Sequence, residues 1–310
     1  MPVADSPRTT LQHRLEYAGI RSIVFVLARV PFRVGSDIGA ALGVLAYRLG
    51  IRARVVETQI AFALPELDVA QIKRIARSSY ENLGRTSIEA ALMEGRSPAD
   101  LIALFDRVDG FEHFDAAIAA GRGALLITGH LGNWELGGSY IAARGIPVDA
   151  IARHMGNRVF ERYLTRVRER FGVKVVFDEH AVRHAPRSVR ANRVVGFLSD
   201  QGVLGLASTF VPFFGRLAKT PRGPAVFALR LRVPVVLAIA VRQPSGKYRL
   251  IVEPVDVVDT GDREADTETL VAHYTARLEY WVREYPEQYF WQHRRWKYQP
   301  AGAPPLPDGM

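Results

Sequence analysis

Cysteine is absent from this sequence, and its absence excludes disulfide frameworks, zinc sites built on thiolates and a thiol nucleophile. Long uncharged apolar runs are absent too. Charged residues interrupt the most apolar segment, residues 15–49, so no stretch approaches the roughly 20 apolar residues that a membrane-spanning helix needs. The first ten residues lack a basic stretch followed by an apolar core and a cleavage site, and we therefore expect no secretory signal peptide.

The composition is that of a folded globular protein with an excess of positive charge. Of the 310 residues, 48% are hydrophobic and 24% are charged, which is ordinary globular usage. The 41 Lys and Arg against 32 Asp and Glu give a net charge of +9, carried almost wholly by Arg. Because guanidinium pairs well with phosphate and carboxylate, we expect a polyanionic partner: an anionic bilayer, a phosphorylated lipid, an acidic carrier protein or a nucleic acid.

Residues 1–109 are expected to form an N-terminal helical region that associates with a membrane. Between residues 11 and 54 the pattern is apolar with Arg at intervals, which is typical of helices that lie on a bilayer surface. The alternative is that these helices pack on the protein's own core, because an apolar stripe at helical spacing usually faces a core. A further helix is predicted at 68–93.

After Gly110 short β-branched or leucine-rich runs alternate with amphipathic segments. This alternation predicts an α/β fold with a mixed, mostly parallel central sheet flanked by helices, and 248–253 is predicted as an antiparallel edge strand. We assign 110–298 to this core and expect the Pro- and Gly-rich tail, 299–310, to be disordered. The predicted strands are 123–128, 147–151, 174–177, 194–199 and 234–241, and the predicted helices are 134–143, 157–171, 221–231 and 266–284.

The segment with the most chemistry is 127–138, where a predicted strand ends and a helix begins. In open α/β sheets ligands bind at this edge. Here His130 and Glu135 are five residues apart, and they can meet only if His130 lies in the turn before the helix, which Gly129 and Gly132 permit. A neutral imidazole backed by a carboxylate can take a proton from an attacking hydroxyl.

A structural alternative is that His130 caps the helix and that Glu135 is a first-turn acid favoured by the helix dipole. Competing motifs are missing, however. The sequence has no G-x-S-x-G elbow, no complete G-x-G-x-x-G, no phosphate-binding G-x-x-x-x-G-K-[ST] and no H-E-x-x-H. The usual signals of hydrolases, dinucleotide-binding proteins and zinc proteases are therefore lacking.

Four blocks, taken in order, resemble the bacterial lipid A late acyltransferase family, which includes phosphatidylinositol mannoside acyltransferases. The hallmark of that family is a histidine followed five residues later by Asp or Glu, as in the block 129–135. The resemblance spans about residues 10–298 and implies a glycerolipid acyltransferase-like fold. The other three matching blocks are 153–172, then 198–202 leading to 211–215, and 285–297.

The resemblance also implies roles for single residues. His130 would be the general base and Glu135 its partner, Arg168 would contact the substrate or the developing oxyanion, and Asp200 would shape the acceptor site. From the residues alone, Arg168 also fits a solvated helix face, and Asp200, at the end of an apolar strand, also fits a pair with an arginine. Further candidates for substrate binding within the blocks are Asn133, Arg153, Gln201 and Arg294.

The last block, 285–297, mixes aromatic and basic residues. This composition fits an anchor at a lipid headgroup layer or a contact with a substrate phosphate. It also fits packing of the block against the sheet. The sequence leaves these interpretations open.

Three functions remain in competition. The first is an acyltransferase that moves a fatty acyl group from acyl carrier protein or acyl-CoA to a hydroxyl of a glycolipid, such as a lipid A precursor or a phosphatidylinositol mannoside. It would need no metal or cofactor, and it would act as a monomer at the cytoplasmic face of the bacterial inner membrane, peripherally or through its N-terminal region. The second is a non-catalytic protein that binds anionic lipid on the same scaffold. The third, nucleic-acid binding, rests on net charge alone, and we do not expect it.

Overall fold

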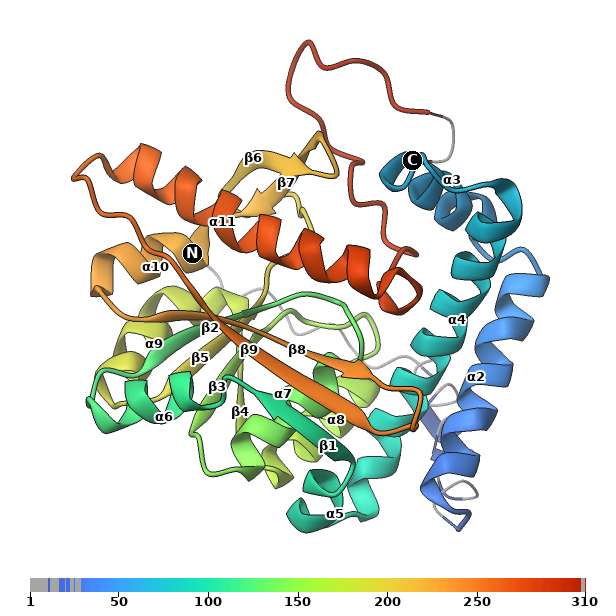
Figure 1. Cartoon of the computed structure of the whole chain (residues 1–310). Coiled ribbons are helices and arrows are strands. Elements are labelled where there is room, and N and C mark those ends of the chain that lie inside the picture. Colours follow the sequence, from blue (N-terminus) through green and yellow to red (C-terminus); the bar gives the residue numbers. More distant parts are fainter. Residues whose placement is uncertain (1–10, 12–16, 20, 23–24, 26–28, 308–309) are drawn as a thin grey trace.

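The computed structural model describes residues 29–307 and 310, together with residues 11, 17–19, 21–22 and 25 (Figure 1). Its α-helices are α2 (Phe32–Arg48), α3 (Ala53–Ala63), α4 (Val69–Leu92), α5 (Pro98–Ile102), α6 (Glu112–Ala119), α7 (Trp134–Ala143), α8 (Arg158–Arg170), α9 (Asp178–Arg190), α10 (Gly223–Leu231) and α11 (Arg263–Glu284). Its strands are β1 (Phe105–Asp109), β2 (Ala124–Thr128), β3 (Val148–Ala152), β4 (Val173–Phe177), β5 (Val194–Leu198), β6 (Ser208–Phe213), β7 (Arg216–Pro221), β8 (Val235–Arg242) and β9 (Tyr248–Val255). Short 3-10 turns occur at Met93–Gly95 and Pro286–Gln288.

Seven strands form the central sheet in the order β1-β9-β8-β2-β5-β3-β4. The strands β8, β2, β5, β3 and β4 are mutually parallel, while β9 runs antiparallel to β8. The prediction of a mixed, mostly parallel sheet flanked by helices is confirmed. The prediction that 248–253 is an edge strand was wrong, because β1 pairs in parallel with the outer side of β9 and takes the edge itself.

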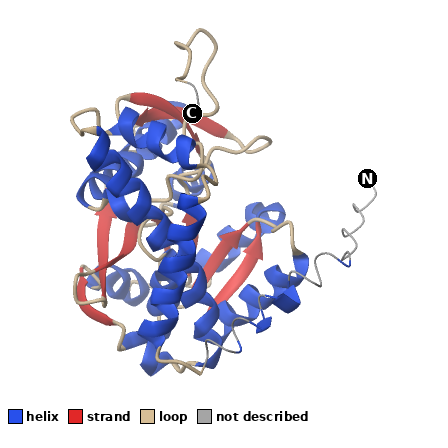
Figure 2. Cartoon of the chain, turned by 90° about the vertical axis from the view of Figure 1, so that its right-hand side faces the viewer, coloured by secondary structure: helices blue, strands red, loops and turns tan. Residues whose placement is uncertain are grey.

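Helices cover both faces of the sheet and bury two separate apolar cores (Figure 2). Alternate residues of each strand point to opposite faces. On β2, for example, Leu125 and Ile127 join the core shared with α9, α10 and α11, whereas Leu126 joins the core shared with α5, α6, α7 and α8. This two-sided burial explains why the central parallel strands β2, β5 and β8 are almost wholly apolar rather than alternating.

The helices α2 and α4 lie side by side along one side of the molecule (Figures 1 and 2). Glycines allow the close approach: a Cβ atom on Gly43 would lie 1.9 Å from the carbonyl oxygen of Tyr80, and one on Gly84 would lie 2.0 Å from that of Gly39. The opposite face of α2 and the turn after it are apolar and exposed. We call the exposed apolar residues of α2 and of this turn the exposed apolar stripe; they are Val34, Ile38, Leu42, Leu45, Leu49 and Ile51.

Among the described residues, no helix taken alone has the length and apolar character needed to cross a bilayer. Together, α2 and α3 meet that test of length and composition, but a bend of 93° separates them. Part of the segment 11–54 expected to lie on a membrane falls outside the described residues.

Several elements were not expected from the sequence, α9 and the pair β6 and β7 among them. The segment 178–190 folds as α9, and β6 and β7 form an antiparallel hairpin outside the central sheet. Beyond the core, residues 299–307 contain no helix or strand, and the guanidinium of Arg216 donates a hydrogen bond to the side-chain oxygen of Gln299 over 3.1 Å.

Candidate active site

The turn between β2 and α7 carries His130 at the carboxyl end of the parallel strands. Gly132 makes this turn possible, because its φ of +66° lies in the left-handed region and a Cβ atom there would lie 1.9 Å from the carbonyl oxygen of Ala240. The last sequence block holds the turn from the other side. The backbone N–H of Phe290 donates to the carbonyl oxygen of His130 over 2.9 Å, and that of Gly132 donates to Gln288 over 3.0 Å. The imidazole therefore projects from a rigid backbone.

Asp200 is the carboxylate that holds the imidazole. Its Oδ1 atom lies 2.7 Å from Nδ1 of His130, and its Oδ2 atom accepts a hydrogen bond of 3.0 Å from the backbone N–H of the same residue. Burial would raise the pKa of Asp200, but the charge of His130 and these hydrogen bonds outweigh burial and hold the pKa well below its usual value. An ionised Asp200 fixes the proton of a neutral imidazole on Nδ1, so Nε2 presents its lone pair.

Glu135 has a different partner, the guanidinium of Arg168 on α8. Its Oε1 atom lies 2.6 Å from Nη2 of Arg168 and its Oε2 atom lies 2.9 Å from Nε. Burial would raise the pKa of Glu135, but the charge of Arg168 and its two hydrogen bonds lower it. The expectation that Glu135 holds the imidazole directly was wrong, because the turn aims His130 at Asp200 while the first turn of α7 aims Glu135 at α8.

A cavity of about 750 Å³ begins at this site, a volume typical of small-molecule pockets. His130, Glu135 and Arg168 line its polar end. Most of the remaining lining is apolar and comes from both faces of the sheet, so the cavity passes around the carboxyl ends of the strands. Apolar residues along the face covered by α7 and α8 include Leu126, Gly138, Ile141, Val148, Ala150, Leu164, Val173, Gly196, Ala238 and Leu250.

The structure brings some of the other predicted residues to the cavity and leaves others away from it. Gln201 and Arg153 line the cavity, the amide nitrogen of Gln201 being 3.4 Å from Nε2 of His130. Asn133 is buried and caps α7, accepting a hydrogen bond of 3.0 Å from the backbone N–H of Leu136. Arg294 is exposed and does not line the cavity.

The last block packs inside the protein. The interpretation of its tryptophans as a headgroup anchor was wrong, because Trp291 and Trp296 are both 0% exposed. Arg295, the neighbour of the predicted Arg294, is buried and donates hydrogen bonds of 2.7 Å to the carbonyl oxygen of Lys219 and to the hydroxyl of Thr220. Packing against the sheet is the interpretation that this part of the structure supports.

Two aromatic side chains beside His130 were missed. The ring of Trp134 lies 4.7 Å from the imidazole and that of Phe290 lies 5.7 Å from it, centroid to centroid, and both line the cavity. Both residues lie inside the sequence blocks that resemble the family, and this was the signal from which their place beside His130 could have been predicted. Their apolar surfaces enclose the imidazole.

A buried carboxylate stabilises the start of α7, next to the turn that carries His130. Glu89 of α4 is 0% exposed and accepts hydrogen bonds from Asn133 (2.8 Å) and from the guanidinium of Arg242 (2.5 Å). Because Asn133 also caps α7, this acid helps to fix where the helix begins. Nothing in the sequence pattern marked Glu89, since a single acid on a long helix usually faces solvent.

Metal-ligating side chains do not gather at the site. Within the part of the chain that the structure describes, no group of three or more His, Asp or Glu residues has an arrangement that could hold a metal ion.

Comparison with known proteins adds independent information. The profile of the family described as bacterial lipid A biosynthesis acyltransferase matches residues 5–298. The chain is 28% identical over 293 residues to the lipid A biosynthesis lauroyltransferase of Escherichia coli K12, a match that covers 94% of each chain.

Two other relatives show the range of the similarity. The lipid A biosynthesis myristoyltransferase of Escherichia coli K12 is 26% identical over 278 residues, which is 86% of this chain and 81% of that protein. The phosphatidylinositol mannoside acyltransferase of Mycobacterium tuberculosis H37Rv is 30% identical over 158 residues, 49% of each chain.

Proposed function

Because this chain belongs to the bacterial lipid A biosynthesis acyltransferase family, and is thus an acyltransferase, we propose that it moves a fatty acyl group from a thioester donor to a hydroxyl of a glycolipid. The observation that carries the proposal is the pair of His130 and Asp200 at the polar end of an apolar cavity. The acceptor would be a lipid A precursor or a phosphatidylinositol mannoside, as the names of the relatives suggest.

The proposed reaction begins with the acceptor hydroxyl beside Nε2 of His130. As the hydroxyl oxygen attacks the thioester carbonyl carbon, Nε2 takes its proton, and the carbonyl oxygen becomes a tetrahedral oxyanion. When the intermediate collapses, the C–S bond breaks and the imidazolium gives the proton to the departing thiolate. Asp200 stabilises the imidazolium in between, as the acid of a hydrolase triad does. Since the thioester is already activated, no metal or organic cofactor is needed.

Arg168 has a supporting role in this proposal. Glu135 accepts hydrogen bonds from the Nε and Nη2 atoms of Arg168 and so holds the guanidinium at the polar end of the cavity, which His130 also lines. Its Nη1 atom then remains for the oxyanion or for a phosphate of the acceptor. A charged donor held in place before the reaction stabilises the transition state without a cost for reorientation. Glu135 is therefore proposed as a positioning residue.

The exposed apolar stripe of α2 and of the turn after it is proposed as the membrane contact. Leu45, Leu49 and Ile51 are 51%, 68% and 55% exposed, and burying such side chains in lipid is favourable by roughly 25 cal/mol for each Å². Arg48 lies on the same helix and Arg52 just after it, where their guanidinium groups can reach lipid phosphates. A glycolipid acceptor would then be reached by a monomer that sits on the cytoplasmic face of the inner membrane.

Mass spectrometry of membrane lipids tests the proposed function. Cells that express the chain should contain a glycolipid heavier by one acyl unit than cells without the gene, and cells that express a folded His130→Ala variant should lack it. The added mass identifies the acyl chain, and the parent mass identifies the acceptor. Identical lipids in all three strains would favour a non-catalytic lipid-binding protein instead.

A further inference from the structure

His154 connects three elements beside the cavity of the candidate active site. It lies in the segment 153–157, between β3 and α8. Its Nδ1 atom is 3.0 Å from Oε2 of Glu161 on α8, and its Nε2 atom is 2.9 Å from Oε1 of Glu179 on α9. The imidazole also stacks on the ring of Phe177 at the end of β4, with the ring centroids 3.8 Å apart. One side chain therefore joins the beginnings of α8 and α9 to the end of β4.

The two carboxylate contacts can be made together by only one form of this imidazole. The imidazolium has two N–H groups, whereas the neutral ring has one N–H group and one lone pair. An ionised carboxylate is an acceptor and has no proton to donate, so a neutral ring would turn its lone pair towards Glu161 or towards Glu179. Both contacts are therefore hydrogen bonds in the charged form, and one of them is lost in the neutral form.

Both carboxylates are negatively charged near neutral pH. Burial would raise the pKa of Glu161, but a hydrogen bond of 2.6 Å from the backbone N–H of Met155 and the bond with His154 outweigh burial and lower it. The pKa of Glu179 is lowered too, first by its own backbone N–H and also by the imidazole. The charge that varies near neutral pH is that of the histidine, a residue type that titrates within the physiological range.

Loss of the second ring proton should break the bond to Glu179 and keep the bond to Glu161. The side chain of Glu161 is 9% exposed, so a lone pair facing this carboxylate would be costly. The side chain of Glu179 is 47% exposed and can turn to water instead. The remaining proton therefore stays on Nδ1 of His154, and α9 loses its hydrogen bond to the imidazole.

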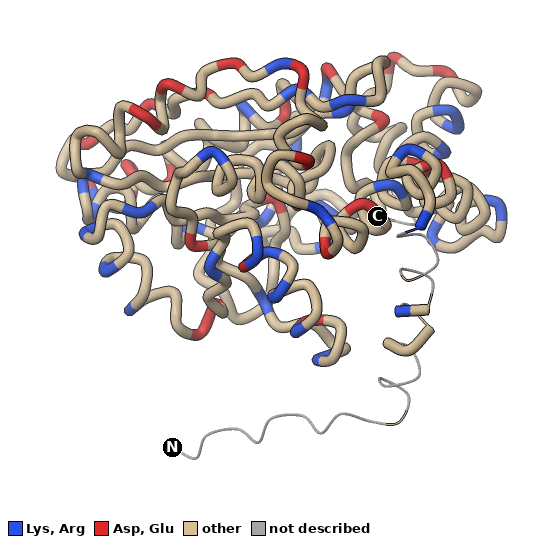
Figure 3. The backbone as a smooth tube through the Cα atoms, turned by 90° about the horizontal axis from the view of Figure 1, so that it is seen from below, with Lys and Arg blue, Asp and Glu red and all other residues tan. Residues whose placement is uncertain are grey.

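Other charged groups around the imidazole make contacts that do not depend on it. Arg158 lies 3.0 Å from Glu161, and Arg153 lies 3.2 Å from Asp178 on α9. His180 of α9 is exposed, and its Nε2 atom is 4.0 Å from the carboxylate of Glu179. Figure 3 shows basic and acidic positions interspersed over the side of the molecule seen from below. Deprotonation of the imidazole would thus remove one contact from a network whose two arginine pairs remain.

The segment 153–157 is part of the wall of the cavity. Arg153, Met155 and Phe177 line the cavity, and Met155 is also 38% exposed. The segment therefore separates the cavity from solvent. We propose that His154 is a pH-dependent link in this wall: its imidazolium ties the segment to α9, and its neutral form releases α9, so that the wall loosens as the pH rises. This link belongs to the cavity and does not depend on the proposed acyl transfer.

Nuclear magnetic resonance of the full-length protein with ¹⁵N-labelled histidine reads the ring protons directly. The variant His154→Phe, which keeps a ring to stack on Phe177 but has no N–H group, assigns the signals by their loss. We expect two ring protons on His154 at about pH 5.5 and one, on Nδ1, at about pH 8.5. A ring with the same number of protons at both pH values would overturn the proposal.

A spin label on the segment measures whether the wall loosens. Because the chain has no cysteine, Met155→Cys supplies a single thiol for a nitroxide, whose electron paramagnetic resonance spectrum reports its mobility. We expect the mobile fraction to rise at least about twofold between about pH 5.5 and 8.5, as loss of one partly exposed ion pair allows. With His154→Phe added, the label should be as mobile at both pH values as it is at the higher pH without that change.

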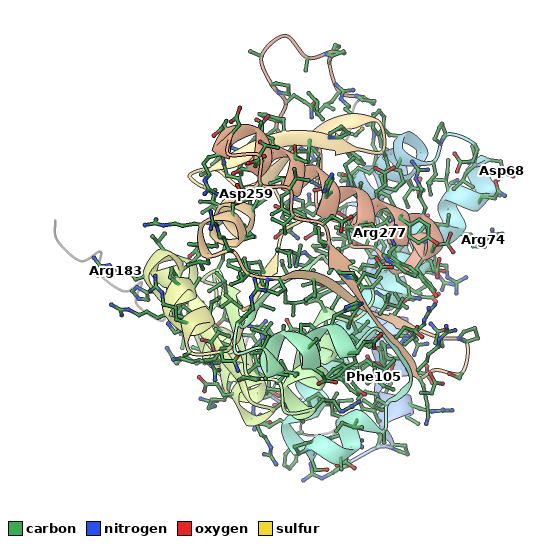
Figure 4. All side chains as sticks on the ribbon, turned by 60° about the vertical axis from the view of Figure 1, so that its left-hand side comes forward. Asp68, Arg74, Phe105, Arg183, Asp259 and Arg277 are labelled. Carbon is green, nitrogen blue, oxygen red and sulfur yellow. The ribbon has the colours of Figure 1, made fainter. Side chains whose placement is uncertain are left out.

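Two controls locate the effect. His180→Gln removes the other histidine beside Glu179, and the label at position 155 should keep its pH dependence there. A label on Arg74→Cys of α4, which Figure 4 shows on the opposite side of the molecule from Arg183 of α9, should be equally mobile at both pH values. The proposal is overturned if the pH dependence at position 155 is absent, survives in His154→Phe or disappears in His180→Gln.

Discussion

Asp200, seventy positions after His130 in the chain, lies with its Oδ1 atom 2.7 Å from Nδ1 of that histidine. The acid five residues after the histidine, Glu135, is instead bound to Arg168 through both of its oxygens. The two acids therefore have different tasks in the proposed site. Asp200 orients the imidazole of His130 and stabilises its protonated form. Glu135 holds the guanidinium of Arg168 in position.

A double-mutant cycle should show that Glu135 and Arg168 stabilise the fold as a pair. We expect Glu135→Gln and Arg168→Gln each to lower the free energy of unfolding, and the two changes to couple by about 1–3 kcal/mol because the side chains are in direct contact. Chemical denaturation of the four proteins measures this coupling. Strictly additive effects would show that the ion pair contributes nothing as a pair.

Gly138 should control the length of the transferred acyl chain. A Cβ atom at this position would meet nothing within 4 Å, and the residue lines the cavity. We expect Gly138→Leu to fill part of the cavity and to shift the preferred donor to a chain shorter by about two to four carbons, since each buried CH₂ contributes about 0.8 kcal/mol to binding. Competition between donors of different length, read by mass spectrometry, measures the preference.

The control for this change is Gly95→Leu. Gly95 is exposed and also has free space around its Cβ position, but it does not line the cavity. It should leave the chain-length preference unchanged. An unchanged preference in Gly138→Leu as well would place the acyl chain elsewhere.

His293 should make the protein less stable in acid. Burial lowers the pKa of His293 to about 4 from its ordinary value near 6.5. Between these two values the unfolded chain binds a proton that the folded chain does not, so stability falls as the pH drops from about 6.5 towards 4. The effect is on the order of 3 kcal/mol. The difference in unfolding free energy between pH 6.5 and 4 should therefore shrink in His293→Gln, and an equal difference in both proteins would contradict this.

The exposed apolar stripe should determine binding to lipid. We expect Leu45→Asp with Leu49→Asp to weaken binding to anionic vesicles by at least about 10-fold, because two buried leucines are lost and two negative charges are added. Co-sedimentation with vesicles measures the affinity. The control, Val257→Asp with Val258→Asp, changes two other exposed apolar residues far along the chain, and it should bind as wild type does. Equal weakening in both pairs would point to an effect of charge alone.

The sequence was sufficient for the fold class because the buried parallel strands are apolar and continuous. Segments such as 123–128 and 234–241 are short apolar runs of strand length, and both form strands of the central sheet. The helix α9 escaped prediction because its sequence is strongly charged and contains Pro186, a residue that usually ends or kinks a helix. The edge strand β1 escaped because its five residues include three charged ones.

The site was predictable in its residue types but not in its pairings. Gly129 and Gly132 indicated that His130 lies in a turn before the helix, and the structure has that turn. Which acid reaches Nδ1, however, depends on the order of strands: β5 lies next to β2, so Asp200 follows the neighbouring strand end. Spacing along one helix contains no information about that neighbour.

The most direct test of the account is the rate of acyl transfer by Asp200→Asn at saturating donor and acceptor. A neutral amide cannot stabilise the imidazolium and leaves Nδ1 without its acceptor, so kcat should fall by about 10³-fold or more while the thermal unfolding transition remains cooperative. Glu135→Gln should retain far more of the rate. A folded Asp200→Asn enzyme with a kcat within tenfold of wild type would contradict the assignment of His130 and Asp200 as the catalytic pair.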